Sequence, residues 1–192
     1  ESRFKARASS KVRSRRFRCS SGMRPGPKRG SNFSQAASRL AGRIAEGYIA
    51  TSGKATELYT EKLLPAVSEG LQKAGRPDDA ISRMIEMKVS FDTDRARAME
   101  DTKIWAALAL SGEQKMGVED PREMERLART VEDVAHRRWL VSDDVDEHIE
   151  QIRPYLEWGF AHLVFHFPGD DQERAMALYA ERVLPELRAR FG

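Results

Sequence analysis

Gly47-Tyr48-Ile49-Ala50-Thr51-Ser52-Gly53-Lys54 is the stretch of sequence that decides the fold. Residues 48–50 predict a buried strand, and residues 51–54 predict a small polar turn that runs directly into a helix. In proteins that alternate strands and helices, ligands bind at the carboxyl ends of the strands, where such turns lie. This stretch therefore predicts an α/β protein with a ligand site at the turn.

The turn carries groups that bind a small anion. Thr51 and Ser52 supply hydroxyls, Gly53 supplies a flexible backbone and Lys54 supplies an ammonium. The helix that follows presents free N–H groups and a partial positive charge at its first turn. These features suit a phosphate or another small anion, and the more ordinary interpretation is a strand, a Ser/Gly turn and a surface lysine. The turn is not a P-loop, because that motif needs a longer Gly-rich loop with Ser or Thr after the lysine, and Ala55 follows Lys54 here.

The composition is typical of one soluble globular protein. The chain has 192 residues, of which 40% are hydrophobic and 33% are charged. This is enough for one sizeable core and too little for two large domains. No apolar run reaches the length of a membrane span, so we expect no membrane partner. The single cysteine, Cys19, excludes an internal disulfide framework and a cysteine-based zinc site, and we expect a cytoplasmic protein.

Charge is unevenly distributed along the chain. The first 30 residues hold eleven basic side chains against one acid, a net charge of +10, so residues 31–192 carry −7 of the overall +3. Because the body is acidic, the basic composition does not indicate nucleic acid as its general partner.

Residues 1–33 predict a disordered basic leader, because they are rich in Arg, Ser, Gly and Pro and show no helical or strand periodicity. Three interpretations are open. The leader could be a nucleic-acid-binding arm, an organelle transit peptide, or translation of a GC-rich gene in the wrong reading frame. We favour the third, since wrong-frame translation of such DNA is rich in these four residues. The chain also begins with Glu1 rather than Met, which is expected of a fragment.

Residues 34–192 alternate helices with three strands. Strands are predicted at 47–51, 84–91 and 162–166, and the first helix at 35–44, with apolar spacing along one face at Ala37, Leu40, Ala41 and Ile44. Such alternation predicts a parallel sheet or barrel. Three strands neither close a barrel nor leave edges that helices can protect. The order therefore predicts the last part of a larger α/β fold.

Three local features carry further expectations. Pro65 should kink or divide the helix predicted at 55–74. Within the strand at 84–91, apolar residues alternate with Glu86, Lys88 and Ser90, which indicates either one face in water or polar groups inside a closed barrel. We expect Trp105 to lie in the core.

A set of motifs in the body resembles a known family. In order along the chain they are Ala41-Gly42-Arg43, the stretch at 47–54, Glu57-Leu58-Tyr59-Thr60-Glu61-Lys62-Leu63, Pro65-Ala66-Val67, Met84-Ile85-Glu86-Met87-Lys88, Glu113-Gln114-Lys115, Arg138-Trp139 and His162-Leu163-Val164-Phe165-His166. They are similar to consecutive motifs of the coenzyme F420-dependent glucose-6-phosphate dehydrogenases, in the luciferase-like superfamily. The resemblance extends from about residue 36 to the C-terminus.

The resemblance implies an α/β fold, the C-terminal portion of a (β/α)8 TIM barrel with the last three of its eight strands. It implies hydride transfer from C1 of glucose 6-phosphate to the deazaflavin of coenzyme F420, which gives 6-phosphogluconolactone. It also implies a homodimer, as in the family.

The phosphate ligands of the family correspond here to Thr51, Lys54, Lys115 and Arg138. A sugar phosphate carries close to two negative charges near pH 7, which two ammonium groups, a guanidinium and a hydroxyl can bind. In barrels, phosphate sites are often built from the loops after the last strands. The alternatives are a solvated loop lysine for Lys115 and an ordinary ion pair with Asp143 for Arg138.

The family's catalytic base, its acid and the tryptophan over the cofactor belong to early strands that have no counterpart here, so no catalytic residue is assigned. We expect His162 and His166 to be structural. Phe33-Ser34 stands where the family has Gly-Gly near the deazaflavin, so the cofactor-binding residues stay unassigned. The expectation is a fragment that retains the substrate-phosphate site without the catalytic residues. The alternative is a non-catalytic protein that binds nucleic acid or an acidic partner through its basic arm.

Overall fold

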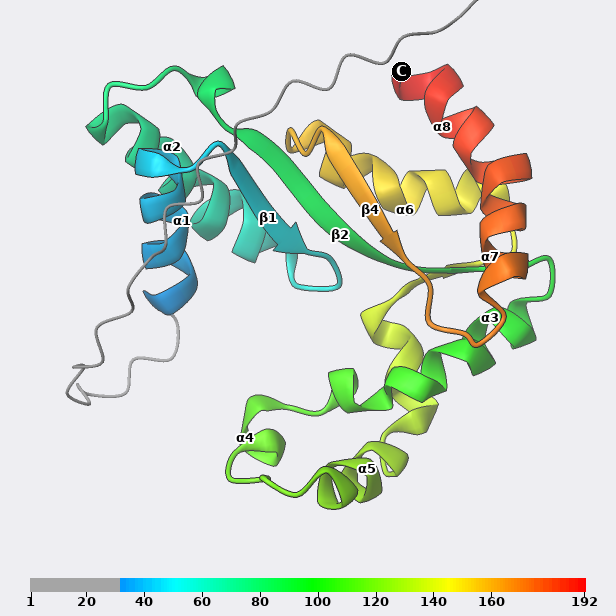
Figure 1. Cartoon of the computed structure of the whole chain (residues 1–192). Coiled ribbons are helices and arrows are strands. Elements are labelled where there is room, and N and C mark those ends of the chain that lie inside the picture. Colours follow the sequence, from blue (N-terminus) through cyan, green and yellow to red (C-terminus); the bar gives the residue numbers. More distant parts are fainter. Residues whose placement is uncertain (1–31) are drawn as a thin grey trace, which may run out of the picture. The chain divides into compact units, whose positions relative to one another are not determined.

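The computed structural model of the chain describes residues 32–192, and the predictions made for the leader lie outside these residues. The described part is an α/β unit in which four parallel strands form one sheet (Figure 1). The strands are β1 (Gly47–Thr51), β2 (Ser82–Phe91), β3 (Leu140–Ser142) and β4 (His162–His166). The α/β class and the parallel sheet expected from the sequence are both found.

β2 is the central strand of the sheet. It pairs with β1 so that Gly47 lies opposite Ser82, and with β4 so that Met84 lies opposite His162. Its last three residues pair with β3. The sequence predicted the three longer strands and missed β3, because a strand of three residues is too short to show an alternating pattern.

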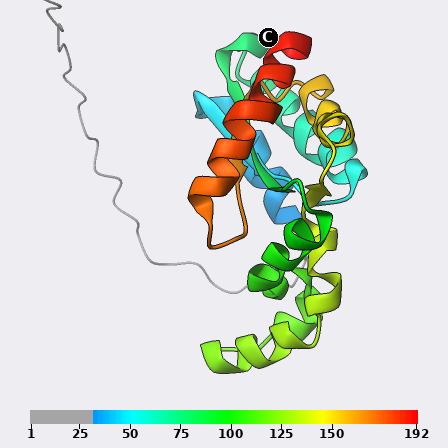
Figure 2. The ribbon, with the colours of Figure 1, turned by 90° about the vertical axis from the view of Figure 1, so that its right-hand side faces the viewer.

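Helices connect the strands and follow the last one. They are α1 (Asn32–Ile44), η1 (Leu58–Leu63), α2 (Leu64–Lys73), η2 (Asp78–Ala80), α3 (Arg95–Asp101), η3 (Thr102–Ala109), α4 (Gly112–Lys115), α5 (Pro121–Arg129), η4 (Glu132–Arg138), α6 (Val145–Glu157), α7 (Gln172–Leu178), η5 (Tyr179–Val183) and α8 (Leu184–Phe191). The predicted division at Pro65 is found, because the π-helix η1 gives way to α2 one residue before it. The long segment from α3 to η4 lies beyond the carboxyl ends of the strands (Figures 1 and 2).

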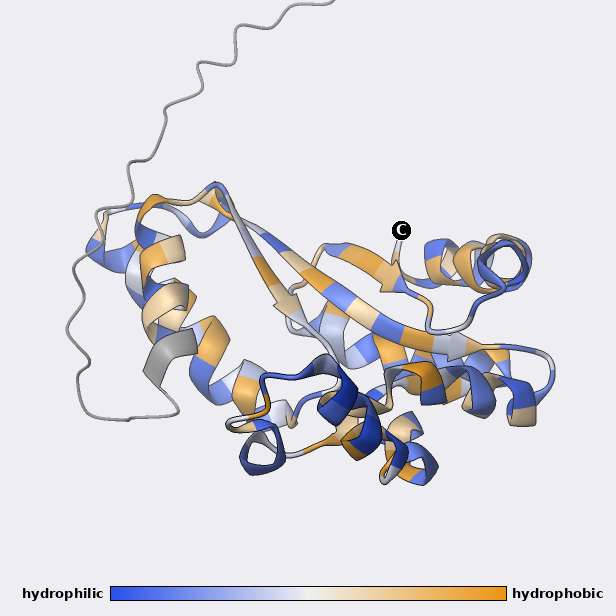
Figure 3. Cartoon of the chain, turned by 60° about the horizontal axis from the view of Figure 1, so that its bottom comes forward, coloured by the Kyte–Doolittle hydropathy of each residue, from blue (hydrophilic) through white to orange (hydrophobic). Residues whose placement is uncertain are grey.

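The main core lies between one face of the sheet and helices η1, α6 and η5–α8. From β2 it takes Ile85, Met87, Val89 and Phe91, all buried. The helices contribute Tyr59, Leu63, Ile149, Ile152, Tyr155, Tyr179, Val183 and Leu187. Figure 3 shows hydrophobic residues along the strands and the helices around them, whereas the segment from α4 to α5 is mostly hydrophilic. Burial of this apolar surface is the main force that holds the helices on the sheet.

The opposite face of the sheet, which we call the open face, carries the alternate residues of the same strands. Its members are Ile49, Thr51, Met84, Glu86, Lys88, His162, Val164 and His166. Lys88 and Ser90 are buried on this side of β2. Of the two interpretations of the alternation, this favours polar groups held inside a fold over a face in water.

α1 packs through a face different from the predicted one. Leu40 and Ile44 are 51% and 68% exposed, whereas Gly42 is buried against α2. A Cβ atom at Gly42 would overlap the carbonyl oxygen of Val67, and one at Gly70 would overlap that of Arg39. The expected core face was wrong for Leu40 and Ile44 because two glycines, and not the large apolar residues, let the helix backbones meet.

This close contact makes Gly42 sensitive to substitution. We expect Gly42→Ala to lower the free energy of unfolding by about 1–3 kcal/mol, since the added methyl group forces the two helices apart. Urea denaturation followed by circular dichroism measures the change. Gly112→Ala is the control, because nothing lies within 4 Å of the added Cβ at that position. Equal stability of the two variants would contradict the packing described here.

The turn after β1 is held by the backbone of Arg138, which packs against Gly53, and by hydrogen bonds to the hydroxyl of Tyr59. Gly53 has a φ of +72°, and a Cβ atom there would lie 2.5 Å from the carbonyl oxygen of Arg138. The hydroxyl of Tyr59 donates to the carbonyl oxygen of Thr51 (2.7 Å) and accepts from the N–H of Lys54 (3.2 Å). Glycine is therefore needed at this position for its backbone conformation and for the approach of another chain segment.

We expect Gly53→Ala to destabilise the protein more than Gly75→Ala. Both glycines have positive φ, at +72° and +64°, but a Cβ atom at Gly75 has nothing within 4 Å. Gly75→Ala should cost about 1 kcal/mol for its left-handed backbone. Gly53→Ala should cost at least about twice that, because it also displaces the Arg138 backbone. Urea denaturation gives both values, and equal values would show that the contact with Arg138 has no energetic weight.

Candidate functional site

The four residues predicted to bind phosphate come from four places in the chain. Thr51 ends β1, Lys54 follows in the turn, Lys115 ends α4 and Arg138 ends η4. Lys54 interacts electrostatically with both Arg138 and Lys115. The structure thus gathers these side chains beyond the carboxyl end of β1, although more than 80 residues separate Lys54 from Arg138.

The electrostatics of this cluster are repulsive. The pKa of Lys54 is lowered, first by burial and then by the positive charges of Arg138, Lys88 and Lys115. Repulsion between positive charges held close together raises the free energy of the protein, and a bound anion would lower it again. The cluster is therefore suited to a ligand with negative charge.

Lys88 is a member of the cluster that the sequence analysis did not single out. This residue is 7% exposed, and its ammonium group donates a hydrogen bond to the hydroxyl oxygen of Thr51. Burial lowers the pKa of Lys88 overall; the nearby Glu86 carboxylate opposes this, and the charge of Arg138 adds to it. The alternation of β2 placed Lys88 on the same face as Glu86, but only the register with β1 shows that Thr51 is within its reach.

Ser52 has a structural role, unlike the anion-binding role expected from its hydroxyl. It is fully buried, and its hydroxyl oxygen accepts from the backbone N–H of Lys88 at 2.7 Å. Its own N–H donates to the carbonyl oxygen of Glu86 at 2.8 Å. Ser52 therefore fastens the end of β1 to β2 and fixes the start of the turn.

Arg138 lacks the ion pair proposed as its ordinary role. Asp143 pairs instead with Arg95, at 3.0 Å, so that alternative was wrong. The Nε atom of Arg138 is buried and has no hydrogen-bond partner among residues 32–192. A guanidinium group with an unsatisfied buried donor beside Lys54 favours a ligand that supplies acceptor oxygens.

A carboxylate–imidazole pair lies next to the cations on the open face. Nδ1 of His166 is 2.9 Å from Oε1 of Glu86, and the Nζ of Lys88 is 3.7 Å from the same oxygen. Burial raises the pKa of Glu86, but its hydrogen bond with His166 and the charge of Lys88 outweigh burial, so the pKa is lowered overall. Glu86 is therefore an anion that balances part of the charge of Lys88.

Two tryptophans enclose His166. The ring centroids of Trp105 and Trp139 lie 4.8 and 5.1 Å from that of His166, both in edge-to-face geometry. The indole N–H of Trp105 donates to the carbonyl oxygen of Pro168 at 3.1 Å. Trp105 is 41% exposed, so its predicted place in the core was wrong. Its apolar neighbours suggested a buried helix, but the segment from α3 to η3 covers the end of the sheet instead.

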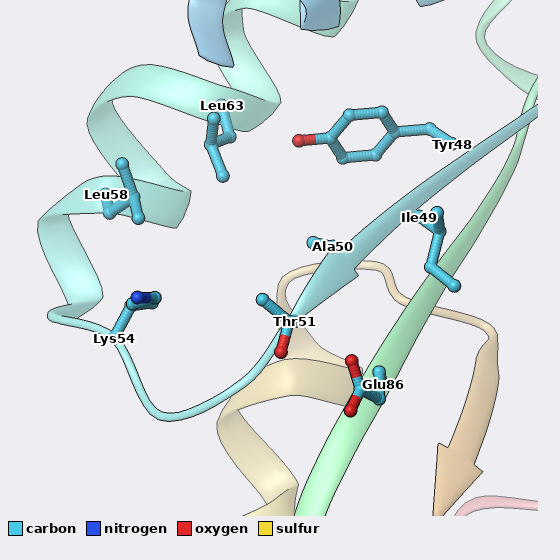
Figure 4. Close-up of a pocket in the computed structure, with 8 residues that line it drawn as sticks. All are labelled: Tyr48, Ile49, Ala50, Thr51, Lys54, Leu58, Leu63 and Glu86. Carbon is cyan, nitrogen blue, oxygen red and sulfur yellow. The ribbon is translucent and has the colours of Figure 1, made fainter. Parts of the chain in front are cut away.

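A pocket of about 580 Å³ opens beside β1 and reaches the turn (Figure 4). Its apolar wall is formed by residues of β1 and η1, and Thr51, Lys54 and Glu86 form its polar part. Figure 4 shows Tyr48 pointing toward the helix that carries Leu63, and Lys54 in the turn that follows Thr51. A pocket with an apolar wall and a few convergent polar groups is typical of a small-molecule site.

Two other kinds of site were searched for in the part of the chain that the structure describes. Residues 32–192 contain no group of three or more His, Cys, Asp or Glu side chains arranged to hold a metal ion. No helix among them combines the length and apolar content that crossing a bilayer requires.

Comparison with curated proteins gives close relatives. The chain is 63% identical over 158 residues to a protein of Nakamurella multipartita and 57% identical over 158 residues to one of Microbacterium testaceum. Both are named F420-dependent glucose-6-phosphate dehydrogenase. Each match covers 82% of this chain and 47% of the relative, so the chain spans about half the length of these relatives. The resemblance inferred from the motifs is confirmed.

Solved structures show the same fold. An F420-dependent secondary alcohol dehydrogenase in complex with an F420-acetone adduct superposes with a TM-score of 0.66 at 23% identity, over 79% of this chain and 46% of that one. The coenzyme F420-dependent tetrahydromethanopterin reductase of Methanopyrus kandleri gives 0.61 at 22% identity, over 79% and 48%. Residues 32–192 thus have the fold of part of a TIM barrel.

The family comparison agrees with the fold and with the relatives. Residues 30–162 match the family described as luciferase-like monooxygenase, which is more than half of the chain. The chain belongs to the luciferase-like monooxygenase family.

Proposed function

We propose that residues 32–192 form the substrate-phosphate site of a coenzyme F420-dependent glucose-6-phosphate dehydrogenase. The observation that carries the proposal is the placement of Lys54 among three further cations, Lys88, Lys115 and Arg138, at the carboxyl end of the sheet. The relatives at 57–63% identity, which bear the name of this enzyme, support glucose 6-phosphate as the ligand.

Each residue has a distinct part in binding the phosphate. The guanidinium group of Arg138 can donate two parallel hydrogen bonds, and Lys54 and Lys115 act as point charges. The hydroxyl oxygen of Thr51 already accepts from Lys88, so its own proton, which otherwise interacts with the Glu86 carboxylate, can turn to a phosphate oxygen. Lys88 thereby orients Thr51 and adds positive charge without needing to touch the ligand.

The proposed reaction oxidises the sugar at C1 and yields 6-phosphogluconolactone. Coenzyme F420, when bound, supplies a deazaflavin that accepts a hydride. The open face fits such a flat ring with polar edges, because the exposed Ile49 on β1 and Val164 on β4 lie on the two strands that flank β2, which carries Glu86. Ile49 and Val164 would pack against the ring. The contribution of the phosphate site is to fix the sugar, so that C1 is presented in one orientation.

We assign no catalytic acid or base within residues 32–192. His166 is paired with Glu86 and enclosed by two tryptophans, so we assign it a positioning role toward that carboxylate. His162 contacts the hydroxyl of Ser82 at 3.0 Å, consistent with a structural role. The family's homodimer stays a prediction, and the alternative function of the basic arm concerns residues outside the described part.

Phosphate binding tests this proposal directly. Isothermal titration calorimetry at low ionic strength should show that the chain binds glucose 6-phosphate. Lys54→Met should weaken binding about tenfold or more, because it removes a charge-assisted hydrogen bond and keeps the aliphatic length. Inorganic phosphate should show the same dependence on Lys54.

Lys73→Met is the matched control, since Lys73 lies on the exposed side of α2 and forms an ion pair with Glu69 at 2.7 Å. Equal affinities of the Lys54 and Lys73 variants would refute the phosphate site. Reduction of coenzyme F420 with glucose 6-phosphate by this chain alone would contradict the placement of the acid and base outside residues 32–192.

A further inference from the structure

Two tyrosine hydroxyls contact the turn that carries Lys54. The hydroxyl of Tyr59, in η1, donates to the carbonyl oxygen of Thr51 at 2.7 Å and accepts from the N–H of Lys54 at 3.2 Å. The hydroxyl of Tyr155, in α6, lies 3.5 Å from the backbone nitrogen of Gly53, at the limit of a hydrogen bond. The two hydroxyls also interact with each other through a side-chain hydrogen bond. Three backbone groups of the turn are thus bound to one pair of side chains.

The hydrogen-bonding capacity of this tyrosine pair is used for the turn. A phenol has one proton to donate and an oxygen that can also accept. Because the proton of Tyr59 goes to the carbonyl of Thr51, the hydrogen bond between the two tyrosines takes its proton from Tyr155. Burial is the largest cause of a raised pKa in both, so each hydroxyl keeps its proton at neutral pH.

This arrangement decides what the turn can offer to a ligand. The N–H groups of Gly53 and Lys54 point to the tyrosine oxygens, so an anion meets the side chains of the turn instead of these two amides. Those side chains are the ammonium of Lys54 and the hydroxyl of Thr51, which lie at the two ends of the turn (Figure 4). Their separation follows from the backbone between them, which is the segment that the tyrosines hold.

A second tyrosine occupies the same local position elsewhere in the chain. Residues 58–65 read Leu-Tyr-Thr-Glu-Lys-Leu-Leu-Pro, and residues 178–185 read Leu-Tyr-Ala-Glu-Arg-Val-Leu-Pro. In both, a π-helix contains the tyrosine and gives way to an α-helix one residue before the proline. Tyr59 and Tyr179 are both buried, but the hydroxyl of Tyr179 lies 2.6 Å from Nε2 of His148. The motif therefore supplies a buried tyrosine, and Tyr59 is the one that holds a turn after a strand.

We infer that Tyr59, assisted by Tyr155, is a positioning residue for the phosphate site. Its hydroxyl sets the separation of the Thr51 hydroxyl and the Lys54 ammonium before a ligand arrives, and neither tyrosine needs to touch the ligand. The inference rests on the proposed function, since it names what holds that site in its binding geometry. A site whose groups are held in advance loses less conformational entropy on binding, so removal of the hydroxyl should appear as lost affinity.

Tyr59→Phe in the full chain tests the inference, because it removes the hydroxyl and keeps the ring that packs in the core. We expect isothermal titration calorimetry to show about tenfold weaker binding of glucose 6-phosphate and of inorganic phosphate. Tyr155→Phe should have a smaller effect in the same direction, since its contact with Gly53 is 3.5 Å long. Amide hydrogen exchange without ligand should become faster at Lys54 in Tyr59→Phe and stay unchanged in β2, which a global loss of stability would not produce.

Tyr179→Phe is the matched control, since it removes a buried hydroxyl from the same motif and leaves the contacts of the turn in place. It should keep the phosphate affinity of the unaltered chain. Equal losses of affinity in Tyr59→Phe and Tyr179→Phe would overturn the inference, because they would reflect stability alone. Unchanged binding by Tyr59→Phe, together with weakened binding by Lys54→Met, would overturn the inference and leave the proposed function standing. Binding that neither Tyr59→Phe nor Lys54→Met changes would overturn both.

Discussion

The rest of the structure depends on the hydrogen bonding of β2. Every other strand pairs with it: β1 along its first half on one edge, β4 along its middle and β3 at its end. Its core-side residues are almost fully buried, which fixes the register, because a slip by one residue would move Ile85 and Met87 to the open face. Since β2 holds the register, it also decides which side chains of β1 and β4 meet on the other side.

The core is connected to the site through Tyr59. Its ring is fully buried, stacked on Trp158 with centroids 5.4 Å apart and edge-on to Tyr155. Its hydroxyl reaches the two ends of the turn, at Thr51 and Lys54. A rigid aromatic cluster thus sets the conformation of the segment that carries the candidate ligands. Rigid support of this kind is what a binding site needs in order to hold its groups before the ligand arrives.

The burial and mutual repulsion of the cations at the site destabilise the folded protein, and the packing of the rest of the fold offsets this. Burial lowers the pKa of Lys54 most, and the positive charges of Arg138 and Lys88 lower it further. Among the carboxylates near them, Glu86 is bound to His166 and lies 3.7 Å from the Nζ of Lys88. Natural proteins accept such repulsion mainly at functional sites. The buried Nε of Arg138 has no hydrogen-bond partner within residues 32–192, which leaves a donor for a ligand oxygen at the site.

The sequence by itself determined the α/β class, the three longer strands, the turn at 51–54 and the family. These follow from local patterns: alternation over residues 85–91 of β2, a Ser/Gly turn after an apolar run, and short motifs in a fixed order. Thr51, Lys54, Lys115 and Arg138 were named from the motifs, and only Thr51 and Lys54 also stood out from local chemistry.

The tertiary structure decided what depends on residues far apart in the chain. The register of β2 with β1 is what places Lys88 beside Thr51. Arg138 lies beside Gly53 because the end of η4 packs against the turn after β1, and no local pattern shows that contact. The exposure of Trp105, Leu40 and Ile44 contradicted their apolar character, because burial is set by what packs against a side chain and not by its hydrophobicity alone. Periodicity shows which face of an element is apolar, and only the packed fold shows which apolar face is covered.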